Sequence, residues 1–445
     1  MGRIDRWRSG EGRGDPPALL VDALESLRTG TNPTDPPGGN RGPIVVIGPS
    51  EVPGWVGEGV GPAEILQCTG LHGQPVSPAC VVELSWDTAR SSELGACLEH
   101  AYAHVAVGGL LLLRISHPGA RAEGPARKWP RASATRAERT LPDLVATALF
   151  RAGFVDPRLV PDHHGGYDVL ARRGAAEPPT RRRHLLSVVM PVYNEVGTFG
   201  EVAKALLAKE ISGVDIEVII VESNSTDGSR DAVKAVMDHP RVTAIFEERP
   251  KGKGHAVRAG LAEARGDFVL IQDADLEYSL DDYDELLEPL RTFEASFVLG
   301  ARSSPAGTWG MRHFDTQVLV SRLMNVGHVG FLALFNAVYR QKLADPFTMY
   351  KVFRRDCIFG MRLECDRFDF DWELTAKLIR AGYTPLEKPV AYASRSFSQG
   401  KKVRLVGDPW SWIVACARYR FAPLHEDLSA PPWPSTRPSS RQARS

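Results

Sequence analysis

The sequence lacks a charge bias and a cysteine framework. Its 54 Lys and Arg residues balance its 54 Asp and Glu residues over 445 positions, so the composition gives no indication of nucleic-acid binding. The six cysteines are scattered, with no C-x-x-C pair among them. Their spacing argues against a zinc site or a disulfide framework and fits a reducing compartment.

Membrane-spanning signals are also missing. No uncharged apolar run reaches the roughly 20 residues that a transmembrane helix needs, and residues 1–7 have no apolar core of the kind that a secretory signal carries. We therefore expect a cytoplasmic protein, with peripheral contact at the inner face of the membrane as an open option.

A length of 445 residues is enough for two or three domains. Gly, Pro and Arg dominate residues 1–42, which we interpret as a disordered arm, and residues 425–445 form a Pro-, Ser- and Arg-rich tail. Between them the composition predicts a small α/β domain at residues 43–173, a linker at 174–184 and a larger domain at 185–424.

The smaller domain contains the buried apolar runs of an α/β unit. Residues 44–47, 81–84 and 110–113 are predicted strands, and residues 93–106 and 141–152 have helical spacing. The Gly-Gly turn before the third strand and the Ala-Gly-Phe sequence after the second helix resemble the later half of class I methyltransferase domains.

Methyltransferases of that class hold their cofactor on a glycine-rich loop directly after the first strand. Here residues 48–53 contain two prolines and only one glycine. We therefore favour a degenerate domain with a structural or partner-binding role over an active methyltransferase.

In the larger domain, apolar strand-like runs alternate with helical patterns. The predicted strands cover residues 185–190, 216–221, 242–246, 266–272 and 297–299. We also predict that Thr198 caps the first helix in a capping box with Glu201. The alternation predicts a Rossmann-like α/β fold with a mostly parallel sheet and helices on both faces. Ligands bind beyond the carboxyl ends of such strands, where Pro191, Glu222 and Asp273 begin loops.

Two acids separated by one residue, Asp273 and Asp275, follow the strand at 266–272. For an isolated pair of this kind, a solvated turn is the simpler explanation. Carboxylate oxygens are nevertheless the ligands that hard cations such as Mg²⁺ and Mn²⁺ prefer, and such cations neutralise diphosphates. Glu277, two residues further on, is a candidate third ligand.

Seven motifs stand in order along the larger domain, at residues 190–195, 221–229, 251–254, 273–275, 345–355, 368–374 and 394–402. Together they resemble the motifs of family-2 glycosyltransferases. The closer resemblance is to the branch that contains dolichyl-phosphate mannose synthases and bacterial polyprenyl-phosphate sugar synthases, and it covers about residues 185–420. The resemblance implies a UDP- or GDP-sugar donor, a Mg²⁺ or Mn²⁺ ion, and inversion by a single displacement at the anomeric carbon.

The resemblance implies a donor pocket built from the loops that follow the strands. The segment from Pro191 to Glu195, which includes Tyr193, would line the base and ribose. Glu222 stands where the family usually has an Asp that contacts the base, and its extra methylene leaves the identity of the base open. Lys253 belongs to a basic loop, predicted to be flexible, that would approach the nucleotide.

The same resemblance places the metal and the phosphates. Asp273 and Asp275 would hold the cation, with Asp275 as the direct ligand and Glu277 as a third candidate. Arg302 and Arg395 match family positions that approach phosphates, to which the planar guanidinium fork of arginine binds bidentately.

Asp371 leaves two roles open. In relatives that act on hydroxyl acceptors, the matching Asp is the general base, because a hydroxyl is a poor nucleophile until it is deprotonated. A phosphate acceptor is already anionic, and Asp371 would then orient the acceptor or Arg395. Glu373 is the second candidate for either role. A helix N-terminal acid stabilised by the helix dipole is the structural alternative.

Two segments suit contact with a membrane surface. Residues 316–339 are largely apolar with one full charge, Arg322, and basic residues 401–404 precede Trp410 and Trp412. Basic residues next to paired tryptophans are typical of interfacial helices. For residues 316–339 we favour surface contact narrowly over a place in the domain core.

Together these patterns predict a metal-dependent, inverting glycosyltransferase with a polyprenyl-phosphate acceptor. Two alternatives stay open: a transferase that glycosylates a soluble hydroxyl in glycan or natural-product assembly, and a non-catalytic scaffold that binds sugar nucleotides. The sequence does not identify the sugar.

Overall fold

The computed structural model describes residues 44–47, 64–65, 77–85, 93–116, 140–161, 167–174, 178–302, 318–367, 369–393 and 408–425. The chain divides into two compact units, one drawn mostly from residues 1–182 and one that includes all of residues 183–445. The predicted arm and nearly all of the predicted tail lie outside the described residues.

The first unit contains a six-stranded sheet in the order β2-β1-β3-β4-β6-β5. Strands β1 to β4 are parallel, whereas β6 runs antiparallel to both β4 and β5. The strands are β1 (Ile44–Ile47), β2 (Glu64–Ile65), β3 (Ser77–Ser85), β4 (Val105–Ser116), β5 (Phe154–Pro161) and β6 (Tyr167–Arg173), and the helices are α4 (Glu93–His104) and α5 (Leu141–Ala152). All the predicted strands and helices are present, but β4 begins at Val105, so the end of the predicted helix and the predicted Gly-Gly turn lie inside this strand. The hairpin of β5 and β6 was not predicted, and the resemblance to methyltransferases stays a prediction.

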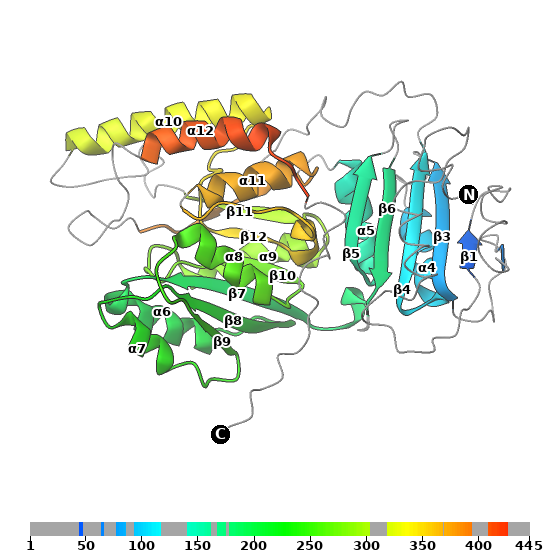
Figure 1. Cartoon of the computed structure of the whole chain (residues 1–445), viewed down its shortest axis with the longest axis horizontal. Coiled ribbons are helices and arrows are strands. Elements are labelled where there is room, and N and C mark those ends of the chain that lie inside the picture. Colours follow the sequence, from blue (N-terminus) through cyan, green and yellow to red (C-terminus); the bar gives the residue numbers. More distant parts are fainter. Residues whose placement is uncertain are drawn as a thin grey trace, which may run out of the picture. The chain divides into compact units, whose positions relative to one another are not determined.

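The second unit is built on a seven-stranded sheet in the order β13-β11-β12-β10-β7-β8-β9 (Figure 1). Every neighbouring pair is parallel except those of β12, which is antiparallel to both β10 and β11. The strands are β7 (His184–Val192), β8 (Val214–Glu222), β9 (Val242–Phe246), β10 (Phe268–Ile271), β11 (Phe297–Arg302), β12 (Lys351–Arg354) and β13 (Leu386–Val390). The predicted α/β fold with a mostly parallel sheet is confirmed.

Helices connect these strands and cover the sheet. The helices are α6 (Val196–Ala208), α7 (Ser229–Lys234), α8 (Lys253–Glu263), α9 (Tyr283–Arg291), α10 (Val318–Tyr339), α11 (Phe370–Arg380) and α12 (Asp408–Phe421), with 3-10 turns η1 (Pro179–Arg181), η2 (Leu280–Asp282) and η3 (Arg355–Ile358). Figure 1 shows α10 and α12 side by side, next to α11. Within the described part of the chain, no helix combines the length and the apolarity that a membrane crossing requires.

Continuous apolar runs form the central strands because helices cover both faces of the sheet. Val188 and Val189 of β7 are both fully buried although their side chains point to opposite faces, and the same holds for Val269 and Leu270 of β10. The core of the unit therefore lies on both sides of β7 and β10, and it holds the ends of these strands in register.

The predicted capping box at Thr198 is wrong. Helix α6 begins at Val196 with Glu195 at its N-cap and no side-chain cap, so Thr198 is the third helical residue. Its hydroxyl instead donates a 2.6 Å hydrogen bond to the carbonyl oxygen of Ala274. The side chain that matched a capping pattern thus fastens α6 to the loop that carries the two acids.

We expect two helix glycines to respond in opposite ways to replacement by alanine. A Cβ on Gly260 in α8 would lie 2.4 Å from Cγ1 of Val189 in β7, whereas Gly200 in α6 has no atom within 4 Å of that position. Gly260→Ala should therefore destabilise the protein by about 1–3 kcal/mol through overpacking. Gly200→Ala should stabilise it by about 0.5–1 kcal/mol.

Urea unfolding of the two variants beside the unchanged protein measures both effects. Equal shifts in the same direction would show that helix propensity alone, and not the contact between α8 and β7, governs Gly260.

Candidate functional site

The candidate site lies at the carboxyl edge of the second sheet. Val192 at the end of β7 pairs with Glu222 at the end of β8, and Glu222 pairs with Phe246 at the end of β9. Strand β12 contributes its first residue, Lys351, to the same edge because it runs antiparallel to its neighbours. The loops predicted to carry the site therefore do meet at one edge.

An acid loop and a lysine face each other after β10. Lys253 Nζ lies 2.7 Å from Oδ1 of Asp273. Asp275 is 8% exposed, and its Oδ1 accepts a 3.2 Å hydrogen bond from the backbone N–H of Glu277. Burial lowers the pKa of Lys253, but the charges of Asp273, Asp371 and Asp275 outweigh burial and raise it. Lys253 is therefore a fixed positive charge among three carboxyl groups.

The loop that carries Lys253 is packed rather than open, unlike the predicted flexible loop. Helix α8 begins at Lys253 itself. A Cβ on Gly254 would lie 2.5 Å from the carbonyl oxygen of Cys365, and one on Gly252 would lie 2.2 Å from that of Asp366. The glycines permit close backbone contact, which fixes the direction of the Lys253 side chain.

The acid loop, residues 273–277, has the carboxylates of a divalent-cation site whose remaining ligands would be water and phosphate oxygens of a bound nucleotide. Among the residues that the structure describes, no three His, Cys, Asp or Glu side chains converge into a metal-binding group. The predicted third ligand, Glu277, accepts a 2.8 Å hydrogen bond from the hydroxyl of Tyr392. Asp273 and Asp275 still fit Mg²⁺ or Mn²⁺, because such ions often take one or two carboxylates and fill their remaining positions with water and phosphate oxygens.

Each of the loops after β7, β8 and β10 contains a non-glycine residue in the left-handed region. Asn194, Asn224 and Leu276 have φ values of 51°, 57° and 58°. Asparagine adopts this conformation readily, whereas it strains leucine. Leu276 stands between Asp275 and Glu277, and strain of this kind concentrates at functional sites. The acid loop is therefore held in a conformation that its own sequence disfavours.

Asp371 is a half-buried acid whose Oδ1 atom is itself buried. It lies in the first turn of α11, and among the described residues its Oδ1 has no hydrogen-bond partner. Lys351 Nζ is 3.7 Å away. Burial raises the pKa of Asp371, although Lys351 and Lys253 oppose the shift. Burial likewise lowers the pKa of Lys351, against the effect of Asp371. Such a carboxyl group is poised to exchange a proton or to accept a hydrogen bond from a ligand.

The structure places Glu373 away from this group. Its carboxylate is fully buried and accepts hydrogen bonds from the backbone N–H groups of Glu364 and Cys365 at 2.8–2.9 Å. Lys377 Nζ lies 2.8 Å from its Oε1. Glu373 therefore ties α11 to the segment before it, and this placement gives it a structural function.

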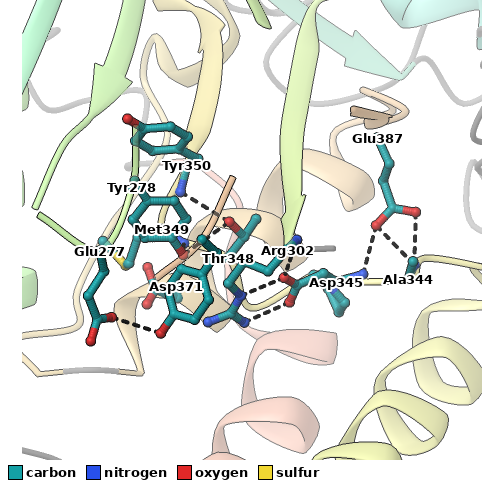
Figure 2. Close-up of polar contacts among 12 residues, drawn as sticks. Glu277, Tyr278, Arg302, Ala344, Asp345, Thr348, Met349, Tyr350, Asp371 and Glu387 are labelled. Atoms are coloured by element: carbon teal, nitrogen blue, oxygen red, sulfur yellow. Dashed lines mark hydrogen bonds and ion pairs between the residues drawn. The ribbon is translucent and has the colours of Figure 1, made fainter. Parts of the chain in front are cut away.

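The guanidinium group of Arg302 is held by the carboxylate of Asp345 (Figure 2). Its Nε and Nη2 donate to Asp345 at 2.6 and 2.8 Å, and Asp345 is in turn fixed through its backbone N–H, which donates to Glu387 at 2.8 Å. Burial lowers the pKa of Arg302, but Asp345 outweighs it and raises this pKa well above its usual value. Its guanidinium carbon also lies 5.3 Å from the ring centroid of Tyr392. The site thus contains a permanently charged arginine whose orientation is set by two acids.

Glu222 is sealed inside the protein. It is fully buried, and its two oxygens accept hydrogen bonds from the backbone N–H of Ser225 at 2.6 Å and from Nη1 of Arg230 at 3.0 Å. Arg230 was not among the predicted residues. The signal that points to it is the acid itself, since a buried carboxylate needs a partner charge.

The remaining predicted site residues are more exposed or lie outside the described residues. Pro191 is half-buried in β7, and Tyr193, just after it, is 39% exposed. Glu195 is half-buried at the N-cap of α6. Arg395 lies outside the described residues, so its predicted contact with phosphate stays a prediction.

The predicted membrane-facing segments are described only in part. The second half of α10 has both buried and exposed apolar side chains, Phe335 being fully buried and Val329 39% exposed. In α12, Val414 is 47% and Phe421 80% exposed. The side chains of Trp410 and Trp412 and the basic residues before them lie outside the described residues. Contact with a membrane therefore stays a prediction.

Comparison with known proteins bears on the same part of the chain. Residues 187–359 match the model of the family described as Glycosyl transferase family 2. The undecaprenyl-phosphate 4-deoxy-4-formamido-L-arabinose transferase of Enterobacter sp. (strain 638) is 28% identical over 223 residues, which cover 49% of this chain and 62% of that protein. The dolichyl-phosphate beta-glucosyltransferase of Saccharomyces cerevisiae is 28% identical over 221 residues, covering 46% and 66%. The chain thus spans less than two thirds of either relative.

Among solved structures, the chain is similar in part to the glucosyl-3-phosphoglycerate synthase of Mycobacterium tuberculosis, solved with Mn²⁺, UDP-glucose and phosphoglyceric acid. The match has 19% sequence identity and a TM-score of 0.40, and it covers 54% of this chain and 81% of that one.

Proposed function

Because residues 187–359 are a glycosyl transferase family 2 domain, we propose that this protein transfers a sugar from a nucleotide-sugar donor to a polyprenyl-phosphate acceptor, with inversion at the anomeric carbon. The observation that carries the proposal is the group at the carboxyl edge of the second sheet. There an acid pair, a charged lysine and a half-buried acid meet within one unit, and the Oδ1 atom of that acid has no hydrogen-bond partner among the residues that the structure describes. The two relatives named above, whose names specify lipid phosphates, support the choice of acceptor.

Each group has a function in this reaction. Asp273 and Asp275 would hold a Mg²⁺ or Mn²⁺ ion, which when bound neutralises the diphosphate as it leaves. Lys253 keeps the acid pair from repelling the approaching diphosphate, because its charge lies 2.7 Å from Asp273. Arg302 adds a second fixed positive charge to the edge of the sheet.

Asp371 favours a second candidate acceptor, a hydroxyl group. A half-buried carboxyl group that has a raised pKa, and one oxygen without a hydrogen-bond partner among the described residues, has the properties of a general base. With a phosphate acceptor, which is already anionic, the same oxygen would orient the acceptor. The two candidates therefore assign different work to Asp371, and this difference can be measured.

The experiment that tests the proposal offers the full-length protein a panel of UDP- and GDP-sugars with Mn²⁺. The acceptors are a short-chain polyprenyl phosphate and, separately, polyprenol and soluble sugar alcohols. We expect transfer to the lipid phosphate, with inversion observed by proton NMR of the product. If no member of the panel supported transfer or metal-dependent nucleotide binding, the proposal that the protein is a glycosyltransferase would be refuted.

Asp371→Asn separates the two acceptors in the same assay. With a hydroxyl acceptor, loss of the base should reduce transfer by about 100- to 10,000-fold. With polyprenyl phosphate the variant should stay within about tenfold of the unchanged protein, since the acceptor needs no deprotonation. Because burial raises the pKa of Asp371, the base would be lost as pH falls through that raised pKa, and the acid limb of kcat/KM should vanish in the variant only for a hydroxyl acceptor.

We also propose that α10 and α12 bring the site to a membrane surface. Exposed Val329, Val414 and Phe421 support this arrangement. Vesicle sedimentation of the full chain with and without anionic lipid would test it, and equal recovery in the supernatant in both cases would contradict it.

A further inference from the structure

The guanidinium group of Arg230 is held at the place where the base of the nucleotide sugar would bind. It follows β8 on helix α7, and its guanidinium carbon lies 5.1 Å from the ring centroid of Phe246, the last residue of β9. Its Nη1 donates to Glu222, Asn224 and the carbonyl oxygen of Glu247 at 3.0–3.1 Å. One nitrogen thus anchors the whole planar group.

The rest of the Arg230 fork remains open to a ligand. Among the residues that the structure describes, every hydrogen bond and ion pair of Arg230 runs through Nη1. Its side chain is 31% exposed, whereas that of Glu222 is fully buried. A base that arrives at this edge therefore meets the Nε and Nη2 donors and cannot reach the carboxylate of Glu222.

The chemistry of this surface selects among bases. An accessible carboxylate would accept a hydrogen bond from the N–H of a uracil ring. Here the carboxylate of Glu222 is buried, and the base would instead meet the Nε and Nη2 donors of Arg230. Guanine presents two adjacent acceptors, O6 and N7, which match an arginine fork bidentately. Adenine has its amino group beside N7, and uracil has its ring N–H beside O4. Either base would therefore place a hydrogen-bond donor opposite one of the two donors of Arg230.

We propose that Arg230 determines the specificity of the base site and selects a guanine nucleotide, so that the donor is a GDP-sugar. The inference rests on the proposed function, because it concerns the donor of that same site. The hydrogen bond from Arg230 to Glu222 occupies the carboxylate, so that a base at this position meets hydrogen-bond donors in place of a hydrogen-bond acceptor. Phe246 holds the guanidinium plane from one side, which limits its rotation.

The test needs no variant at first. Binding of GDP, UDP, inosine diphosphate and 7-deaza-GDP to the full-length protein is measured by calorimetry with Mn²⁺, and inorganic pyrophosphate serves as the control without a base. We expect GDP to bind about tenfold or more tightly than UDP, as a bidentate arginine contact allows. Inosine diphosphate, which keeps O6 and N7, should bind like GDP, and 7-deaza-GDP, which lacks N7, should bind several-fold more weakly, by about threefold or more.

Arg230→Lys then assigns the preference to this side chain. Lysine keeps the charge beside Glu222 but loses the planar fork. We expect GDP to bind about tenfold more weakly to the variant, with UDP and pyrophosphate within about twofold. A circular dichroism melt confirms that the variant is folded.

The possible outcomes separate this inference from the proposed function. Binding of UDP as tight as that of GDP, equal binding of GDP and 7-deaza-GDP, or an unchanged GDP preference in Arg230→Lys would each overturn the inference and leave the glycosyltransferase standing. Failure of all nucleotides and of pyrophosphate to bind would instead refute the proposed function.

Discussion

The Asp275→Ala variant is expected to lose transfer activity by about 100- to 1000-fold, the scale found when one preorganised electrostatic contact at a reacting centre is removed. Asp275 is 8% exposed and belongs to a loop whose conformation is fixed by Thr198 and strained at Leu276. Alanine removes the proposed cation ligand and should leave that loop in place, so we expect the effect to fall on the reaction and on metal affinity rather than on folding.

The measurement is the dependence of transfer rate on Mn²⁺ concentration. The unchanged protein should lose activity in a chelator and regain it on adding Mg²⁺ or Mn²⁺. In Asp275→Ala the saturation curve should shift to much higher metal concentration or disappear. Asp231→Ala, at an exposed carboxylate, is the matched control and should behave like the unchanged protein. Full activity of Asp275→Ala at low metal concentration would refute the assigned metal site.

Glu373→Ala should have the largest effect on stability, a loss of about 3–5 kcal/mol in the free energy of unfolding. The substitution leaves Lys377 buried without its partner charge, and it deprives the backbone N–H groups of Glu364 and Cys365 of their acceptor. Trp372, adjacent in sequence and 4% exposed, provides a fluorescence signal for urea unfolding.

A double variant tests the cause of that loss. Glu373→Met with Lys377→Met replaces the buried ion pair by an apolar pair and should recover part of the lost stability, because neither charge is then left alone. The exposed pair of Asp231 and Lys234 is the control, and its disruption should leave the unfolding midpoint unchanged. A shift in Glu373→Ala no larger than that control would contradict the structural assignment of Glu373.

The contrast between Asp371 and Glu373 shows where sequence patterns end. Both acids lie in the first turn of α11 and both belong to one motif. Residues two positions apart on a helix do not share a face, so one carboxylate faces Lys351 and the other faces Lys377. Their spacing alone shows that only one of them faces the site, but choosing that one requires the rotation of α11 about its axis, which tertiary packing sets.

Most of the parallel sheet could be predicted because its strands are apolar on both faces. Strands β1 and β9 have the predicted bounds, and the predicted loops do meet at one edge. Strand β12 escaped prediction because two of its four residues, Lys351 and Arg354, are charged and yet fully buried. Burial of such residues depends on partners supplied by distant segments, as Asp371 supplies one for Lys351.

Arg230 escaped prediction for a related reason. The sequence shows an acid at the end of one strand and a basic residue in the next helix, a pattern that surface residues also produce. Only the fold shows that Glu222 is excluded from solvent and that Arg230 covers it.

The pairing of β13 with β11 has a consequence for how the protein is made. Residues 386–390 lie beside residues 297–302, and Glu387 of β13 fixes the backbone of Asp345, which holds Arg302. A nascent chain can form β7 to β10 long before residue 386 leaves the ribosome, and pairings between distant segments form slowly. We therefore expect the proposed nucleotide end of the site to form early in synthesis, and Arg302 to acquire its orientation only after β13 has been made.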